Sequence, residues 1–278
     1  MKLYYRGIIM HGIYVGNNKM LIQTIIGYRL YCFADDKSLT PDLVFKGIFE
    51  VPLTKYMIKN LRDGDTVIDA GANIGYFTAL AALKVGTEGK VISYEASKRN
   101  FELLKENVAF LCVGNTVELR NKAVYKEEKE LTFFASHQWN GNGSLLKHDE
   151  AYFNHFKTDV ILEEKIQGEP LNVHMDKDFI HLIKMDIEGG EFNALVGLEK
   201  LLKAKKVGTV IFELNKLRAE SPKAFFDLLI SYQKNYNLTF GELNTSGDVI
   251  PTTLEALFEK DFVESVVMNC SGTPNNNL

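Results

Sequence analysis

Residues 67–77 read VIDAGANIGYF, and this stretch decides the fold. A short apolar run ends at Asp69, and Gly71 and Gly75 follow before the chain becomes apolar again. Glycine permits a tight turn and a close approach of the backbone to a ligand. The order of buried strand, glycine loop and helix is typical of α/β domains that bind nucleotides at the carboxyl ends of their strands.

Strands and helices alternate along most of the chain after this loop. Gly75 to Val85 is apolar enough for a buried helix, and Ser97 and Ser221-Pro222 are typical starts of two further helices. Such alternation predicts an α/β fold with a doubly wound, mostly parallel, seven-stranded sheet. The expected strands are residues 66–69, 91–95, 116–120, 179–185, 207–214, 238–243 and 262–268.

The sequence predicts two domains. Residues 1–50 are rich in β-branched and aromatic residues, and we expect a β-rich extension with an antiparallel hairpin. Residues 51–278 form the main domain, which starts with a helix over 53–61. Residues 125–178, between the third and fourth strands, are too long for a plain connection and are interpreted as an insertion. The extension could pair two copies as a homodimer, but the sequence does not decide the oligomeric state.

The composition excludes several classes of protein. The 278 residues carry a net charge of -4 with a pI of about 5.9, which disfavours nucleic acid as the main partner. No apolar run reaches the roughly 20 residues that a membrane span needs, and Met1 to Met10 lacks the features of a signal peptide. Three widely spaced cysteines fit neither a zinc site nor a disulfide framework. These features predict a cytoplasmic protein.

The spacing of the loop glycines indicates the cofactor. The dinucleotide fingerprint would need a glycine where Asn73 stands, whereas Asp-x-Gly-x-x-x-Gly is the pattern of methyltransferases that use S-adenosylmethionine (SAM). Asp69 suits the cationic amino group and sulfonium of SAM and would repel a diphosphate. Glu95 ends the next strand, where an acid accepts hydrogen bonds from ribose hydroxyls. The predicted cofactor-binding residues are Asp69, Gly71, Ala72, Asn73, Gly75, Tyr76, Glu95, Ala96, Ser97, Asn121, Lys122, Ala123 and Asp186.

A second cluster of charged residues follows the expected fourth strand. Residues 182–191 read LIKMDIEGGE, so a lysine interrupts an apolar strand that Asp186 ends. A buried Lys184 needs an acidic partner. Acids in the first turn of a helix also favour its dipole, so Glu188 and Glu191 have a capping interpretation beside the functional one.

Together these motifs resemble the FkbM family of SAM-dependent methyltransferases. The resemblance rests on residues 69–75, on Glu95, on residues 184–191 and on Glu213, and it covers roughly residues 45–215. Ala96 and Gly190 depart from the residues common in the family, and neither change removes a chemical group. The resemblance implies methyl transfer to a hydroxyl oxygen, often on sugars, glycans or polyketide-type natural products, and therefore a small-molecule or glycan partner.

Methyl transfer requires an acceptor placed in line with the methyl carbon, and a base assists a hydroxyl acceptor. We expect Asp186 to orient or deprotonate the acceptor, with Lys184 and Glu188 as further catalytic residues. Glu191 and Glu213 would hold the acceptor. In a metal-dependent variant, Asp186, Glu188 and Glu213 would bind Mg²⁺ through carboxylate oxygens.

The insertion contributes a glycine-rich loop with the only tryptophan. Trp139, Asn140 and Ser144 are expected to bind the acceptor, with Trp139 stacked on a sugar or ring. The alternative is a hairpin turn whose tryptophan packs on the domain. Three further alternatives concern function: a nitrogen or carboxylate acceptor, an NAD-dependent oxidoreductase, and a SAM-fold binding protein without catalysis.

Overall fold

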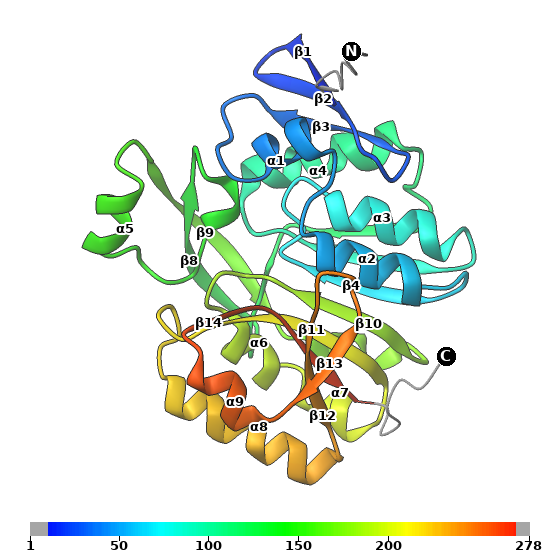
Figure 1. Cartoon of the computed structure of the whole chain (residues 1–278), viewed down its shortest axis with the longest axis vertical. Coiled ribbons are helices and arrows are strands. Elements are labelled where there is room, and N and C mark those ends of the chain that lie inside the picture. The colour runs from blue at the N-terminus through cyan, green and yellow to red at the C-terminus, as the bar shows by residue number, and fades with distance from the viewer. Residues whose placement is uncertain (1–10, 271–278) are drawn as a thin grey trace, which may run out of the picture.

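The computed structural model describes residues 11–270, and a large mixed sheet runs through its centre (Figure 1). Five strands are parallel and lie in the order β6 (Val117–Arg120), β5 (Lys90–Tyr94), β4 (Thr66–Ala70), β10 (Ile180–Met185) and β11 (Val207–Asn215). Three antiparallel strands continue the sheet: β14 (Phe262–Asn269), β12 (Thr239–Leu243) and β13 (Val249–Thr252). The predicted α/β class and parallel centre are confirmed.

The sheet has one more strand than predicted. β13 is the additional strand, and it pairs only with β12 at the edge of the sheet. It carries Pro251, and proline argues against a strand except at such an edge. The sequence pattern therefore missed it for a physical reason.

Helices cover both faces of the sheet because alternate strand residues point in opposite directions. On one face Val67 and Val91 pack against α2 (Val51–Asn60), α3 (Tyr76–Val85) and α4 (Lys98–Phe110). On the other face Ile68 and Ile92 belong to the core that includes α6 (Glu191–Val196), α7 (Glu199–Lys203), α8 (Pro222–Tyr236) and α9 (Leu254–Glu259). None of the helices within residues 11–270 has the length and apolar character that crossing a bilayer demands.

The single helix predicted after β10 is wrong in one respect, because α6 and α7 are two short helices. They are separated at Gly197, where an added Cβ would lie 2.4 Å from the carbonyl oxygen of Tyr125. The chain from the insertion therefore passes too close to this helix for a larger residue.

The N-terminal extension is a three-stranded antiparallel sheet rather than a simple hairpin. It consists of β1 (Gly12–Gly16), β2 (Lys19–Gln23) and β3 (Arg29–Phe33), followed by α1 (Leu39–Lys46). Asn107 on α4 bonds to both the amide and the carbonyl of Tyr31, at 2.7 and 2.9 Å. The extension is thus joined to the main domain. The outer ends of the two predicted domains, residues 1–10 and 271–278, lie outside the described residues.

The segment between β6 and β10 forms a separate small sheet beside the main one (Figure 1). Its strands lie in the order β7 (Ala123–Val124), β9 (Ile161–Glu169) and β8 (Lys129–Ser136). Phe133 and Ile166 are buried in its own apolar cluster. The segment also contains α5 (Glu150–His155) and the 3₁₀ turns η1 (Asn140–Asn142) and η2 (Leu171–Asp176).

Candidate active site

The loops after β4 and β10 touch at the carboxyl end of the sheet. The two strands are neighbours, with Lys184 opposite Asp69 in the register. Gly71 has a positive φ of 79°, and a Cβ there would lie only 1.8 Å from the carbonyl oxygen of Asp186. Only glycine fits this crossing, and it brings the predicted cofactor loop against the predicted catalytic loop.

Lys184 joins the two loops electrostatically. Its ammonium donates a hydrogen bond to the carbonyl oxygen of Gly71 at 2.8 Å. It lies 3.4 Å from a carboxylate oxygen of Asp69 and 3.7 Å from one of Asp186. Burial alone would lower the pKa of Lys184, but the two carboxylates outweigh it and raise the pKa above its ordinary value. Lys184 is therefore a permanent cation with the acidic partner that the sequence predicted.

The role predicted for Asp69 needs correction. Asp69 is 1% exposed, accepts a hydrogen bond from Thr78 at 2.6 Å, and lines neither of the cavities described below. Its side chain points toward α3, so its charge pairs with Lys184 instead of reaching a ligand. Asp69 is thus linked to the cofactor loop through Lys184, whose ammonium bonds to Gly71.

Backbone amides from two loops hold the carboxylate of Glu95, the predicted ribose-binding acid. One carboxylate oxygen accepts from the amide of Asn73 at 2.7 Å, and the other from the amide of Ser97 at 2.8 Å. Burial raises the pKa of Glu95 to about 7, although these two amides favour the charged form. The carboxylate is thus held between the loops that follow β4 and β5.

A cavity next to Glu95 combines a polar side with an apolar side, and we call it the cofactor cavity. Nine predicted residues line it: Gly71, Asn73, Glu95, Ala96, Lys122, Ala123, Asn140, Asp186 and Glu188. Its apolar wall comes from Val124, Phe133 and Leu145, which belong to or pack against the small sheet of the insertion. This apolar wall suits a flat ring such as adenine. No sequence motif marks it, because Phe133 lies within an ordinary strand.

The remaining predicted cofactor residues do not line this cavity. Ser97 caps α4, and the side-chain amide of Asn121 donates to the carbonyl oxygen of Glu95 at 2.8 Å. Gly75 lies where a Cβ would come within 2.7 Å of Leu104, so it sets the packing of α3 on α4. Ala72 and Tyr76 line a second cavity instead of the first.

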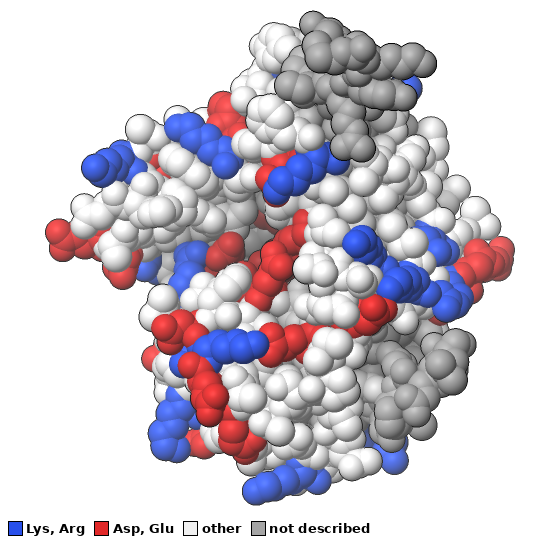
Figure 2. Space-filling model, in the orientation of Figure 1, with Lys and Arg blue, Asp and Glu red and all other residues white. Residues whose placement is uncertain are grey.

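The second cavity, which we call the acceptor cavity, adjoins the first. Both are lined by Gly71, Asn73, Gly141, Asp186 and Glu188. Carboxylates dominate its polar lining, and Figure 2 shows acidic side chains around the hollow near the centre of this face. The acids in its lining are Glu50, Asp186, Glu188, Glu213 and Glu264, against the single basic residue Lys184.

Burial and mutual repulsion raise the pKa values of several of these acids, so that they retain a proton at a higher pH than usual. Burial, with help from Asp186, raises the pKa of Glu50 to about 8. Burial also raises the pKa of Glu188 to about 8, even though Arg218 lies 2.6 Å away and favours the charged form. The pKa of Glu213 is raised by burial and by the neighbouring acids. Perturbed carboxyl groups of this kind are common in sites that bind or deprotonate ligands.

The three predicted metal ligands come together. Carboxylate oxygens of Asp186, Glu188 and Glu213 all lie within 4.8 Å of one another. Their chemistry fits Mg²⁺, which prefers oxygen ligands. One oxygen of Glu188 is already engaged by Arg218.

Three residues predicted to bind the acceptor have structural roles instead. Glu191 is 2% exposed and accepts from the amides of Ile187 and Gly189 at 3.0 and 2.9 Å, which is the capping interpretation. Ser144 is fully buried and donates to the carbonyl oxygen of Glu188 at 2.7 Å. Trp139 lines neither cavity: its ring packs 5.0 Å from that of Phe156, the alternative that the sequence left open.

Glu50 is the clearest site residue that the sequence did not predict. It stands at the N-cap of α2 with a left-handed φ of 36°, yet its side chain makes no capping hydrogen bond and lines the acceptor cavity. A non-glycine residue in this conformation is strained, and such strain is frequent at functional sites. The following Val51-Pro52 marks a helix start, which was the only available signal.

Comparison with known proteins agrees with this geometry. A sequence profile described as the Methyltransferase FkbM domain matches residues 69–239, more than half of the chain. The chain belongs to the FkbM methyltransferase family. The matched residues include the loops after β4 and β10 as well as Glu95 and Glu213. The resemblance inferred from these residues is therefore confirmed.

Individual proteins that resemble this chain share little sequence with it or match only part of it. The structure of an FkbM methyltransferase from Methylobacillus flagellatus KT is 14% identical and covers 77% of this chain and 50% of its own, with a TM-score of 0.45. An O-methyltransferase from Bacillus cereus in complex with SAH is 13% identical and covers 79% of each chain, with a TM-score of 0.39. A curated relative from Saccharolobus solfataricus, a probable cobalt-precorrin-6B C(15)-methyltransferase (decarboxylating), is 31% identical over 86 residues. That match covers 28% of this chain and 43% of the relative, so this chain spans half or less of the M. flagellatus and S. solfataricus proteins.

Proposed function

We propose that this FkbM-family protein transfers the methyl group of SAM to a hydroxyl oxygen of a sugar, glycan or similar hydroxyl-rich acceptor. The observation that carries the proposal is the shared boundary of the two cavities. Asp186 and Glu188 line both, so a cofactor in the first cavity and an acceptor in the second would meet beside these carboxylates. Family membership supports the methyl donor, and the cavity chemistry supports the acceptor.

The cofactor cavity offers a place for each part of SAM. Glu95 would accept hydrogen bonds from the ribose hydroxyls, and the apolar wall with Phe133 would contact the adenine. The sulfonium would then lie toward Gly71 and Asp186, where the negative carboxylate favours its charge. SAM seated this way would direct its methyl group toward the acceptor cavity.

The transfer is an in-line displacement. A lone pair of the acceptor oxygen forms the new O–CH₃ bond while the S–CH₃ bond breaks, and its electrons remain on sulfur to give S-adenosylhomocysteine (SAH). The hydroxyl proton passes to a carboxylate, for which Asp186 is the candidate because it lies at the boundary. Placement of the oxygen about 3–3.5 Å from the methyl carbon supplies much of the rate, and the base contributes about 10²–10⁴-fold.

The acids of the acceptor cavity favour hydroxyl-rich ligands. Ionised carboxylates only accept hydrogen bonds, whereas protonated ones also donate a hydrogen bond. Glu50 and Glu188, with pKa values raised to about 8, would offer both forms near neutral pH. A ligand with several hydroxyl groups, each of which donates and accepts, matches such a lining.

A metal-assisted variant uses the same carboxylates. Asp186, Glu188 and Glu213 would hold Mg²⁺, which would supply positive charge beside the acceptor oxygen and lower its pKa. We favour the metal-free mechanism because Arg218 and Lys184 already place positive charge beside these acids. Activity that is abolished by EDTA and restored by Mg²⁺ would support the metal-assisted variant instead.

The acceptor class is tested with SAM labelled in its methyl group. The protein is incubated with labelled SAM and a panel of methyl glycosides, primary amines and carboxylic acids, and products are identified by mass spectrometry. We expect SAH formation with the glycosides and label in a methyl ether. Label in an N-methyl group or a methyl ester would contradict the hydroxyl acceptor, and SAH binding without any turnover across the panel would favour the non-catalytic alternative.

A further inference from the structure

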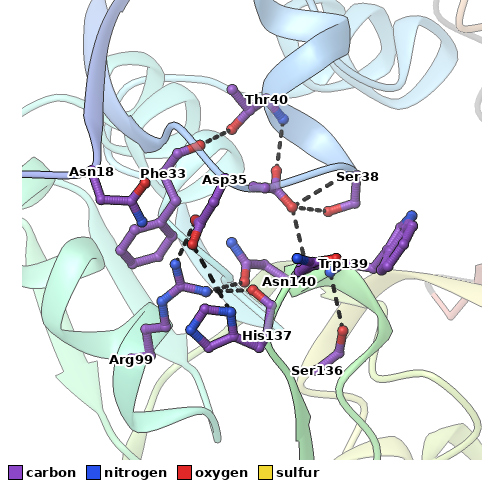
Figure 3. Close-up of polar contacts among 12 residues, drawn as sticks. Asn18, Phe33, Asp35, Ser38, Thr40, Arg99, Ser136, His137, Trp139 and Asn140 are labelled. Atoms are coloured by element: carbon purple, nitrogen blue, oxygen red, sulfur yellow. Dashed lines mark hydrogen bonds and ion pairs between the residues drawn. The ribbon is translucent and has the colours of Figure 1, made fainter. Parts of the chain in front are cut away.

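The turn between β3 and α1 is bonded to the insertion, although about 100 residues separate them in sequence (Figure 3). Asp36 in this turn is 6% exposed. One of its carboxylate oxygens accepts from the amide of Asn140 at 3.2 Å and from the hydroxyl of Ser38 at 2.6 Å. Ser38 in turn accepts from the amide of Gly141 at 3.2 Å, and the amide of Lys37 donates to the carbonyl oxygen of Gln138 at 2.6 Å.

Arg99, in the first turn of α4, holds the same part of the insertion from another direction. Its guanidinium donates to the side-chain oxygen of Asn140 at 3.0 Å and to the carbonyl oxygen of His137. It also pairs with Asp35 at 2.6 Å, which joins α4 to the N-terminal turn, as Figure 3 shows. Asn140 is therefore fixed through both its backbone and its side chain.

The segment held in this way, residues 137–143, borders both cavities, and we call it the wall loop. Asn140, Gly141 and Gly143 line the cofactor cavity, and Gly141 and Asn142 line the acceptor cavity. Asp36 and Arg99 line neither cavity. Asp36 also bonds to Ser38 and Leu39, which line the acceptor cavity but not the cofactor cavity. The wall loop is therefore the route that Asp36 and Arg99 share to a ligand in the cofactor cavity.

Helix capping accounts for the hydrogen bonds of only one of the two carboxylate oxygens of Asp36. Its second oxygen accepts from the amides of Leu39 and Thr40 at 3.0 and 2.8 Å, which caps the start of α1. The first oxygen reaches across to Asn140 instead. Arg99 makes no contribution to α1, so the two side chains share the wall loop and not the helix cap.

We propose that Asp36 and Arg99 are positioning residues that order the wall loop before the cofactor binds. The N-terminal segment would thus set cofactor affinity, although it lies outside residues 69–239, which match the family profile. A loop that is already ordered does not lose its conformational freedom on binding, so less binding energy is spent on ordering it. The proposal rests on the proposed cofactor and is independent of the acceptor.

The test measures SAH binding by calorimetry in the full chain and in Asp36→Asn and Arg99→Gln variants. We expect either variant to weaken SAH binding about tenfold, because the loop must then be ordered during binding. Asp42→Asn is the matched control for the first, since Asp42 pairs with Lys46 on α1 away from the loop. Lys98→Gln is the control for the second, because Lys98 is the exposed neighbour of Arg99. Both controls should bind SAH as the unchanged protein does.

A second readout separates loop order from general loss of stability. Trp139 is the only tryptophan of the chain and precedes Asn140, so its fluorescence anisotropy reports on the wall loop. We expect lower anisotropy in both free variants and recovery at saturating SAH. Unchanged SAH affinity in the folded variants, or weaker binding with unchanged anisotropy, would overturn the proposal. If loss of the α1 cap unfolds Asp36→Asn, the Arg99→Gln variant still tests the proposal. Absence of SAH binding by the unchanged protein would instead contradict the proposed function.

Discussion

The cofactor cavity and the acceptor cavity share a boundary but differ in how the chain builds them. The cofactor cavity takes most of its polar side from loops that directly follow β4, β5, β6 and β10, with Asn140 from the insertion. The acceptor cavity takes Glu50 from the start of α2, Glu213 from β11 and Glu264 from β14. The polar side of the cofactor cavity thus comes mainly from the ends of parallel strands, whereas the acids of the acceptor cavity come from structurally different parts of the chain. Short sequence motifs can therefore predict the cofactor, whereas the residues that select the acceptor can be identified only from the whole fold.

The largest effect should come from the point where the cavities meet. Gly71→Ala would place a Cβ 1.8 Å from the carbonyl oxygen of Asp186 at a φ of 79°. We expect SAH binding to be lost in calorimetry, because one of the two loops must move. Gly64→Ala is the matched control, since Gly64 has a φ of 85° and open space around it. Normal SAH affinity in Gly71→Ala would show that the crossing does not shape the site.

Asp186→Asn should separate chemistry from binding. The amide keeps the shape of the carboxylate but cannot accept the hydroxyl proton. We expect turnover of the acceptor found in the labelling screen to fall by about 10²–10⁴-fold, with a much smaller change in SAH affinity. Asp227→Asn, an exposed acid on α8, serves as the control. Unchanged turnover would remove Asp186 from the reaction.

Glu95→Gln should affect the cofactor cavity alone. The glutamine would turn an amide group toward one of the backbone amides of Asn73 and Ser97, which both donate to the carboxylate. We expect SAH affinity to fall roughly tenfold to a hundredfold, as for the loss of hydrogen bonds to a charged group. Glu102→Gln, on the exposed side of α4, should leave affinity unchanged. An equal loss of acceptor affinity would mean that the two cavities are not separable.

The acceptor cavity should lower stability at high pH. Burial raises the pKa of Glu50 from 4.5 to about 8, so the folded protein retains a proton that the unfolded chain has lost. The associated stability is complete below about pH 4.5 and is lost as the pH rises through 8. Glu50→Gln cannot ionise, so we expect its melting temperature to exceed that of the unchanged protein by roughly 2–4 °C at pH 9 but not at pH 4.5. Glu255→Gln, an exposed acid on α9, is the control, and parallel melting curves for Glu50→Gln and the unchanged protein would contradict this explanation.

The sequence located many of the residues that line the cofactor cavity, because local sequence sets the positions of these residues. Gly71 and Glu95 directly follow β4 and β5, and a short apolar run in the sequence marks each of these strands. It predicted Asp69 wrongly because pairing with Lys184 depends on which strands are neighbours, and β4 and β10 are about 110 residues apart in sequence. Glu50 and Phe133 were missed for the same reason: ordinary local patterns conceal side chains that only the tertiary fold brings to the cavities.

A crystal structure with bound SAH would show whether the cofactor cavity holds the nucleoside beside Glu95. We expect ribose hydroxyls within hydrogen-bonding distance of the Glu95 carboxylate, adenine against Phe133, and sulfur facing Asp186 at the boundary of the two cavities. SAH bound elsewhere, or a ribose that makes no contact with Glu95, would contradict the assignment of the cofactor cavity.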